Sequence, residues 1–368
     1  MVDLSAVAGR LEPHDARFMR VALWHAARGT GGTTPNPVVG AVIVDDDRVV
    51  VGLGHHERAG GPHAEVVALA VAGDRARGAT LYCTLEPCSH TNRTGPCAVA
   101  VRDAGIRRVV VATGDPNPRV AGAGFGYLRD HGIDVTVGVG RAEADAQNAP
   151  FFSVIVRGRP WVITKVAMSL DGRVARAPGE RTGITGAEAN RWTQRLRGGV
   201  DAIAVGADTI LVDDPQLTVR EVARRRPLTR VVFDRRLRTP PSARLFSTLE
   251  AGAVLLVTTA GRAGSPEGQA LAAVGASLVC ADGTMGDALR RLAALDVLTL
   301  LVEGGPTVHG ALWAEGLVDH VAELVAGDAL GNGGVPAHLA TTTPHLERRR
   351  IVPLGRDVLM EGDVHRID

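Results

Sequence analysis

The sequence predicts an α/β protein of two domains, and three observations lead to that prediction. The chain has 368 residues, too many for one ordinary core when a domain averages about 150 residues. Short apolar runs typical of buried strands alternate with helix-spaced segments along both halves. The two halves share no motif and no internal repeat, which favours two different activities over a duplication.

The N-terminal half alternates helix and strand patterns, which implies a sheet covered by helices. Residues 14–28 have apolar side chains at helical spacing, and a turn-rich loop follows over 29–37. The apolar runs 38–44 and 49–53 flank a turn of three aspartates and predict a hairpin. The next expected elements are a helix over 63–72, a strand over 80–84, a helix over 96–104, a strand over 109–113, the end of a helix at 127–131 and a strand over 134–139.

A second αβ unit is expected to start near Pro160. The segment 147–159 contains Pro150 and Gly158, so we place the boundary there, with domains 1–149 and 150–368. The elements expected beyond it are strands over 161–168, 202–205, 230–233, 254–258 and 299–302, a helix over 187–197 and a helix over 306–314.

One passage of the sequence indicates a specific chemistry. His63, Cys88 and Cys97 are three ligands of the kind that Zn²⁺ prefers, and three protein ligands leave the fourth tetrahedral position open for water, as in a catalytic site. Glu65 is not needed as a ligand and is placed to carry protons between that water and a leaving amine. The zinc deaminase signature has the same order, His-x-Glu and then Pro-Cys-x-x-Cys, but here the second cysteine comes nine positions after the first.

The residue types fit hydrolytic deamination. Displacing ammonia from an amino-pyrimidine needs hydroxide at neutral pH, and zinc lowers the pKa of bound water to about 7. The alternative is a structural Cys/His cluster, which needs a fourth protein ligand. His90 could supply it, two residues after Cys88 in a loop of Thr, Asn, Arg, Gly and Pro.

Composition excludes several classes of function. A net charge of +1 and 3% aromatic residues argue against a nucleic-acid groove, so the arginine runs 224–226 and 348–350 are assigned to solvated surface. Four cysteines do not make a disulfide scaffold, and Cys83 and Cys280 are expected to be buried thiols. The start of the chain does not look like a signal peptide, and no apolar run reaches the ~20 residues of a membrane span. We therefore expect a cytoplasmic protein with no membrane partner.

Six motifs in order resemble the bifunctional deaminase/reductase family of riboflavin biosynthesis, and the wide cysteine spacing is part of the resemblance. The match runs nearly end to end. The motifs are Thr34-Pro35-Asn36-Pro37-Val38-Val39-Gly40, Glu86-Pro87-Cys88-Ser89-His90, Asp115-Pro116-Asn117-Pro118, Lys165-Val166-Ala167-Met168-Ser169-Leu170-Asp171-Gly172-Arg173, Leu211-Val212-Asp213-Asp214-Pro215 with Leu217-Thr218-Val219-Arg220, and Glu303-Gly304-Gly305-Pro306-Thr307.

The resemblance implies a fold and two consecutive reactions. It implies a cytidine-deaminase-like three-layer αβα domain followed by a dihydrofolate-reductase-like αβ domain. The first would use Zn²⁺ to hydrolyse the 2-amino group of a diamino-hydroxy-pyrimidine that carries ribosylamine 5′-phosphate, and the second would use NADPH to reduce the ribosyl group of the product to ribityl. It also implies phosphorylated pyrimidines as partners and a homo-oligomer, dimer or tetramer, formed through the reductase domain.

The resemblance implies site residues as well. The deaminase substrate contacts are Asn36, His56, His90 and Arg93, although His55 could replace its neighbour. The reductase substrate contacts are Arg181, Arg197, Arg220 and Glu303. The cofactor contacts are Met168, Gly183, Thr209, Asp213, Gly304, Gly305, Pro306 and Thr307. The residues themselves support the assignment of the glycines, because two glycines between a strand and the start of a helix suit phosphate binding. A Rossmann domain is disfavoured, because no Gly-x-Gly-x-x-Gly follows a strand near the start of this half.

The chain departs from the family pattern at several positions. Where the family usually reads Ser-x-Trp-Ile-Thr, this chain reads Arg181-Thr182-Gly183-Ile184-Thr185, so a substrate hydroxyl and a cofactor-packing indole are both absent. Arg235 replaces a usual serine, and Asn92 replaces a usual glycine. We expect Arg181 either to bind a phosphate or to be a solvated loop residue.

Three other functions are compatible with parts of the sequence. The first is a deaminase of another nucleotide base with a C-terminal half that binds but does not reduce. The second is a zinc-stabilised nucleotide-binding regulator, against which the ligand count speaks. The third is a tRNA or DNA base deaminase, which the near-zero net charge and low aromatic content disfavour.

Overall fold

The computed structural model describes residues 9, 11–89, 96–118, 120–337 and 345–364. The chain forms two compact units, Met1–Arg157 and Gly158–Asp368. The segment in which the sequence places the domain boundary contains a helix, α6 (Ala149–Arg157), and the division between the units falls at the end of that helix. Among the described residues, no helix combines the length and apolar character that a membrane span requires.

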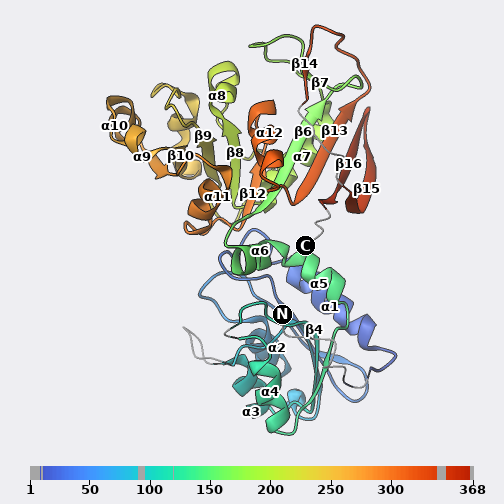
Figure 1. The fold of residues 1–368 in the computed structure, drawn as a ribbon. Coiled ribbons are helices and arrows are strands. Elements are labelled where there is room, and N and C mark those ends of the chain that lie inside the picture. Colours follow the sequence, from blue (N-terminus) through green and yellow to red (C-terminus); the bar gives the residue numbers. More distant parts are fainter. Residues whose placement is uncertain (1–8, 10, 90–95, 119, 338–344, 365–368) are drawn as a thin grey trace. The chain divides into compact units, whose positions relative to one another are not determined.

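The first unit is built on a five-stranded sheet with the order β2-β1-β3-β4-β5 (Figure 1). β1 pairs antiparallel with β2 and β3, whereas β3, β4 and β5 run parallel. The strands are β1 (Gly40–Val44), β2 (Val50–His55), β3 (Thr80–Leu85), β4 (Arg108–Thr113) and β5 (Asp134–Val137). All five apolar runs expected as strands form strands, with small shifts at their ends.

Helices cover both faces of this sheet. On one face, α1 (Asp15–Ala27) and α5 (Arg141–Gln147) pack through a core that includes Phe18, Leu23 and Tyr82. On the other face, α2 (Ala64–Ala72), α3 (Cys97–Asp103) and α4 (Ala123–Asp130) pack through Ala68, Val101 and other side chains. The short turn η2 (Gly73–Ala76) follows α2. The unit is therefore a three-layer αβα sandwich.

A glycine lets α2 approach the sheet closely. A Cβ atom on Gly54 of β2 would lie 2.3 Å from the carbonyl oxygen of Ala64, closer than real contacts allow. Only glycine permits this separation, because it has no side chain. The close approach fixes the N-terminal end of α2, where His63 and Glu65 lie, against the sheet.

The second unit is built on a nine-stranded sheet with the order β11-β10-β9-β8-β12-β6-β13-β16-β15. The first seven of these strands run parallel, and β16 and β15 are antiparallel to their neighbours. The strands are β6 (Trp161–Met168), β8 (Ala202–Gly206), β9 (Thr229–Phe233), β10 (Val254–Thr258), β11 (Ala276–Cys280), β12 (Thr299–Val302), β13 (His320–Ala326), β15 (Leu346–Leu354) and β16 (Asp357–Val364). A separate short pair joins β7 (Arg173–Ala175) to β14 (Val335–Pro336).

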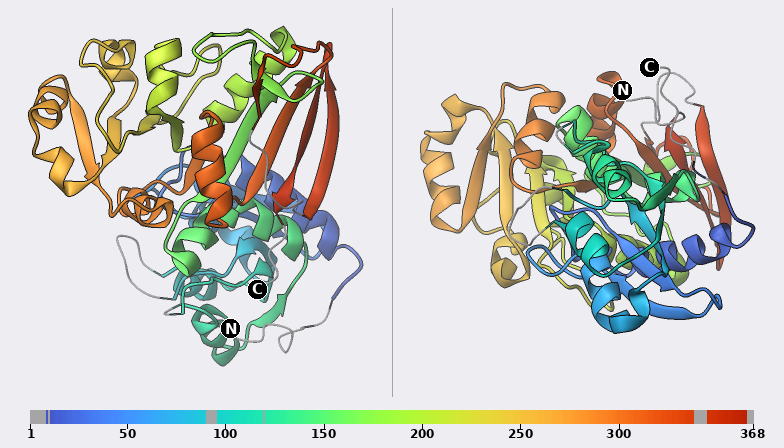
Figure 2. Two further views of the ribbon diagram at one scale, coloured as in Figure 1. Left: turned by 45° about the horizontal axis from the view of Figure 1, so that its top comes forward. Right: turned by 90° about the horizontal axis from the view of Figure 1, so that it is seen from below.

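Helices flank this sheet too, as the views in Figure 1 and Figure 2 show. One core contains Leu289 of α11 (Met285–Ala293) and Leu312 of α12 (Pro306–Ala314). Another contains Ile210 of α8 (Ala207–Asp213), Leu245 of η3 (Arg244–Ala251) and Leu271 of α10 (Pro266–Ala273). The remaining helices are α7 (Ala187–Gly199), which packs on β13 and β16, and α9 (Ala260–Ala263).

Every strand and helix expected in this half is present, but the sequence did not predict several others. Strands β11, β13, β15 and β16 and helices α8, α10 and α11 are additions. The expectation for Cys280 was wrong. It lies on β11, at one edge of the sheet, where its side chain is exposed, whereas Cys83 is buried in β3 as expected.

Candidate active sites

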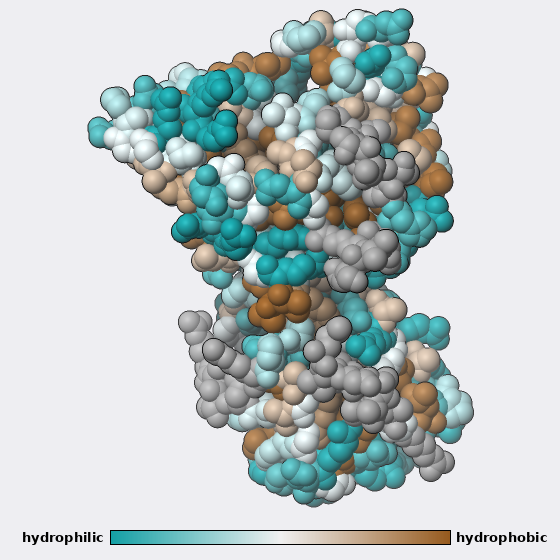
Figure 3. Space-filling view, in the orientation of Figure 1, coloured by the Kyte–Doolittle hydropathy of each residue, from teal (hydrophilic) through white to brown (hydrophobic). Residues whose placement is uncertain are grey.

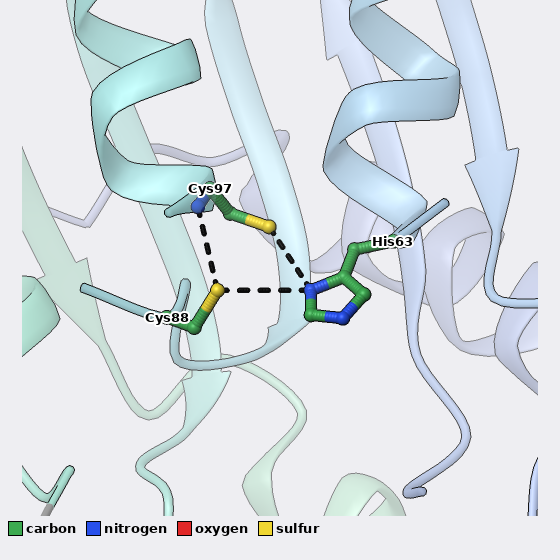
Figure 4. A group of neighbouring side chains, drawn as sticks. All are labelled: His63, Cys88 and Cys97. Carbon is green, nitrogen blue, oxygen red and sulfur yellow. Dashed lines mark hydrogen bonds between the residues drawn. The ribbon is translucent and has the colours of Figure 1, made fainter. Parts of the chain in front are cut away.

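The first unit brings His63, Cys88 and Cys97 together (Figure 4). His63 directly precedes α2, Cys88 follows β3, and Cys97 is the first residue of α3. The Nδ1 atom of His63 lies 3.1 Å from Sγ of Cys97 and 3.6 Å from Sγ of Cys88. Ligand atoms of a tetrahedral zinc site with the usual bond lengths are about 3.5–3.8 Å apart, so the three side chains fit Zn²⁺.

The two thiols are electronically different. The hydrogen bond from the Cys97 thiol, with that from His63, lowers the pKa of Cys88. The backbone N–H of Cys97 also donates to Sγ of Cys88, at 3.3 Å. These contacts favour the thiolate of Cys88, the form in which cysteine binds metal.

Glu65 is the second residue of α2 and lies beside this cluster. It is only 3% exposed, and burial raises the pKa of its carboxyl to about 7. A group with that pKa can both accept and release a proton at neutral pH. The cluster formed by the metal ligands does not include it, which agrees with a role in proton transfer.

Asn36 and His56 lie next to the metal ligands and contact one another. The His56 ring is 5.4 Å from the His63 ring and almost perpendicular to it. Nδ1 of His56 lies 3.0 Å from the carbonyl oxygen of Pro62, so that nitrogen carries the proton, and Nε2 accepts a hydrogen bond of 3.0 Å from the Asn36 side chain. Burial lowers the pKa of His56, consistent with a neutral ring. His56 thus orients the Asn36 amide, while His90 and Arg93 lie outside the described residues.

We predict that Cys88→Ser or Cys97→Ser removes the metal, whereas Cys83→Ser and Cys280→Ser retain it. Thiolates hold Zn²⁺ at about 2.3 Å, and a serine hydroxyl is a poor replacement. Metal analysis of the four purified variants checks this. Equal metal loss from Cys83→Ser would assign a different set of ligands.

The second unit contains a cavity of about 940 Å³, which has many of the residues expected in the reductase site on its walls. The expected residues that line it are Arg181, Gly183, Arg197, Thr209, Asp213, Arg220, Glu303, Gly304, Gly305 and Pro306. Met168 and Thr307 are not among its lining residues. Met168 is buried at the end of β6, and Thr307 is exposed on α12.

An ion cluster that is only slightly exposed lines this cavity. Both carboxylate oxygens of Glu303 bind the Arg197 guanidinium, at 2.7 and 3.1 Å, and Nζ of Lys165 lies 3.6 Å away. Arg197 also donates to the carbonyl oxygen of Thr218, at 3.2 Å. The Arg197 guanidinium is therefore occupied by the protein itself, so it holds Glu303 in place.

The sequence reasoning did not single out Lys165 as a site residue. A signal was available, because Lys165 is the only lysine in the chain, all other Lys/Arg positions being arginine. It also lies in the middle of an otherwise uncharged strand. Lysine is a compact point charge that arginine cannot replace at a close contact.

Two other arginines in the cavity have side chains that are available to bind a ligand. Within the described part of the chain, the guanidinium groups of Arg181 and Arg220 have no hydrogen bond or ion pair. Burial raises the pKa of Asp213, and the positive charge of Arg181 opposes this effect. A Cβ atom on Gly183 would meet nothing within 4 Å, so the space beside Arg181 is open.

Comparisons with known proteins cover both units. The family model "Cytidine and deoxycytidylate deaminase zinc-binding region" matches residues 12–113, and the model "RibD C-terminal domain" matches residues 160–360. The riboflavin biosynthesis protein RibD of Aquifex aeolicus is 38% identical over 351 residues, 94% of this chain and 97% of that protein. RibD of Escherichia coli is 39% identical over 353 residues, 92% of this chain and 94% of that protein.

Solved structures give the same result. Acinetobacter baumannii RibD, form 1, is 37% identical with a TM-score of 0.87, covering 96% of this chain and 99% of that one. A diaminohydroxyphosphoribosylaminopyrimidine deaminase/5-amino-6-(5-phosphoribosylamino)uracil reductase of Thermotoga maritima is 32% identical with a TM-score of 0.83, covering 95% and 99%. These matches confirm the expected fold class, a cytidine-deaminase-like αβα domain followed by a dihydrofolate-reductase-like αβ domain.

Proposed function

The chain belongs to the RibD family of bifunctional deaminase/reductases of riboflavin biosynthesis, and from that premise we propose that its two units act in turn on one phosphorylated pyrimidine. The first unit removes the 2-amino group of the diamino-hydroxy-pyrimidine that carries ribosylamine 5′-phosphate. The second reduces the ribosyl group of that product to ribityl. The observation that carries the proposal is the pairing, in one chain, of a three-ligand zinc cluster beside Glu65 with a glycine-lined cavity that holds Glu303.

The deaminase residues divide the work among them. His63, Cys88 and Cys97 hold Zn²⁺, which when bound lowers the pKa of a water to about 7 and so supplies hydroxide. Glu65 moves the proton from the attacking oxygen to the departing nitrogen. Asn36, held by His56, offers an amide that can bind the pyrimidine edge, and His90 and Arg93 complete the substrate contacts.

The reductase residues surround the cavity of the second unit. NADPH, when bound, supplies the hydride. Gly304 and Gly305 precede α12 and offer backbone N–H groups to its phosphates. The other cofactor contacts that we assign are Gly183, Thr209, Asp213 and Pro306, which line the cavity. Glu303 and Arg220 bind the substrate, and Arg197 acts through Glu303.

The decisive test measures product mass and metal content together. The chain is incubated with the phosphorylated pyrimidine, with and without NADPH. We expect one zinc per chain, a deaminated product without NADPH and a deaminated, reduced product with it. A product that is never reduced would favour the alternative of a deaminase whose C-terminal half only binds, an alternative that the family match over residues 160–360 does not support.

Arg181→Ser is predicted to raise the Michaelis constant for NADPH or for the phosphorylated pyrimidine by about tenfold, more strongly at low salt. The reason is that an unpaired guanidinium in a cavity can bind phosphate with two parallel hydrogen bonds, each a charge-assisted contact. Arg191→Ser is the matched control, because Arg191 lines the same cavity but already pairs with Glu188 at 3.3 Å. Unchanged constants for both ligands in Arg181→Ser would make Arg181 a solvated loop residue.

Two copies of the chain associate through the second unit. Strands β15 and β16 pair Ile351 with Met360 and Pro353 with Val358 on the face that α7 does not cover, and Ile351 is 72% exposed. Figure 3 shows hydrophobic patches along the edge of this unit where β15 and β16 lie in Figure 1. An exposed apolar face on an edge hairpin favours pairing with a second copy. A single monomeric species in sedimentation velocity would contradict this.

The cytoplasm is the compartment that we assign to the enzyme. The four cysteines are free, and the cytoplasm keeps thiols reduced whereas oxidising compartments favour disulfides. Expression with a fluorescent tag at either end tests the assignment.

A further inference from the structure

A buried carboxylate that has no assigned role lies two residues before Cys88. Glu86 is 4% exposed and follows β3. Its Oε2 atom accepts hydrogen bonds from the backbone N–H groups of Asp115, at 3.2 Å, and Gly122, at 3.0 Å. Its Oε1 atom accepts from the N–H of Gly124, at 2.9 Å. One side chain therefore fastens both ends of the connection between β4 and α4, including the first N–H groups of that helix.

The same connection packs directly against the segment that carries the metal ligand Cys88. A Cβ atom on Gly124 would lie 2.1 Å from the carbonyl oxygen of Pro87, which leaves no space for any side chain. Pro87 precedes Cys88, and the carbonyl oxygen of Cys88 accepts a hydrogen bond of 3.0 Å from Ala98 on α3. The metal segment is thus held between α4 on one side and α3, which carries Cys97, on the other.

We propose that Glu86 is a positioning residue of the deaminase centre: through the 115–124 connection it fixes Cys88 at the distance from His63 and Cys97 that a metal ion requires. The inference rests on the proposed zinc centre and adds a residue to it. It also gives a role to the Asp115-Pro116-Asn117-Pro118 motif, whose first residue donates its backbone N–H to this carboxylate and whose Asn117 N–H donates to the Asp115 side chain.

A carboxylate suits this role better than an amide. Three N–H donors approach two oxygens, and glutamine has only one oxygen. In Glu86→Gln, an amide oxygen that accepts from Asp115 and Gly122 would turn its NH₂ group toward the N–H of Gly124, and two donors would face each other at about hydrogen-bond distance. The 115–124 connection would have to move, and Pro87 and Cys88 with it.

The experiment compares zinc affinity and the Co²⁺ absorption spectrum of wild type, Glu86→Gln and Gly124→Ala, all as full chains. Loss of a residue that orients a metal ligand costs about 10–100-fold in metal affinity. We expect that loss in both variants, with a changed cobalt–thiolate spectrum. Gly126→Ala is the matched control, because Gly126 lies in the same helix and a Cβ atom there would meet nothing within 4 Å.

The readouts separate positioning from simple stability. A purely structural role would lower the unfolding free energy of the metal-free chain and leave the cobalt spectrum of the folded variant unchanged, and that result would overturn the proposal. If Glu86→Gln does not fold, Gly124→Ala decides, because its backbone conformation is ordinary and the added Cβ atom displaces the Pro87 carbonyl oxygen and presses on the Glu86 side chain, the two contacts that the proposal invokes. A wild type that binds neither metal would overturn the zinc centre first, and this proposal with it.

Discussion

Glu65→Gln is expected to lower the deamination rate by about 10²–10⁴-fold, to or below the limit of detection, while zinc and NADPH-dependent reduction are retained. Glu65 is buried beside the three metal ligands but is not one of them. Glutamine keeps the size of the side chain and removes its ability to carry a proton. The cost should therefore fall on the chemical step, with little change in the assembly of the site.

Three measurements on one preparation check this expectation. Metal analysis reports the zinc, product mass reports deamination, and NADPH oxidation with the already deaminated pyrimidine reports the second unit. Glu57→Gln is the control, because its side chain is 72% exposed and only eight positions away in the chain. Loss of zinc from Glu65→Gln would mean that Glu65 helps to hold the metal.

The zinc centre could be predicted because short local motifs contain its ligands and its proton carrier. A histidine followed by Ala-Glu at the start of a helix, and a Pro-Cys after a strand, specify ligand type and place without any knowledge of the fold. The parallel strands could be predicted for a similar reason, since buried runs such as 299–302 are apolar throughout.

Other features depend on contacts between distant parts of the chain. Val302 pairs with Thr164 across β12 and β6, and this register alone brings Glu303 next to Lys165. No local pattern contains that information. Strand β15 was missed for another reason: it lies at the edge of the sheet and is mostly exposed, so its sequence shows no buried face.

The contacts of Arg197 also join distant parts of the chain. Resemblance assigned it to the substrate, but the structure engages its guanidinium with Glu303 and Thr218. A motif identifies a residue near the site. Only the contacts decide whether that residue binds the ligand or a neighbour.

Glu303→Gln is expected to lower the unfolding free energy of the second unit by about 3 kcal/mol and to abolish reduction, because it leaves two largely enclosed cations, 13% and 16% exposed, without their carboxylate. Burial alone would raise the pKa of Glu303, but the charges of Lys165 and Arg197 outweigh it and lower that pKa to about 2. The ionised carboxylate therefore stabilises the fold fully above its ordinary pKa of 4.5, and this contribution is lost as the pH falls toward 2. The difference in unfolding free energy between wild type and variant should narrow as the pH falls from 4.5 toward 2.

Urea unfolding followed by tryptophan fluorescence measures the effect, since Trp161, Trp192 and Trp313 all lie in the second unit. The double variant Lys165→Met/Glu303→Gln removes one of the two cations and should recover part of the lost stability while remaining unable to reduce the substrate.

Glu323→Gln is the control, because burial raises the pKa of that carboxyl and no cation opposes the shift. Its replacement should cost far less than that of Glu303. A double variant no more stable than Glu303→Gln would show that repulsion between Lys165 and Arg197 is not the cause, and reduction by Glu303→Gln at the wild-type rate would remove Glu303 from the reductase site.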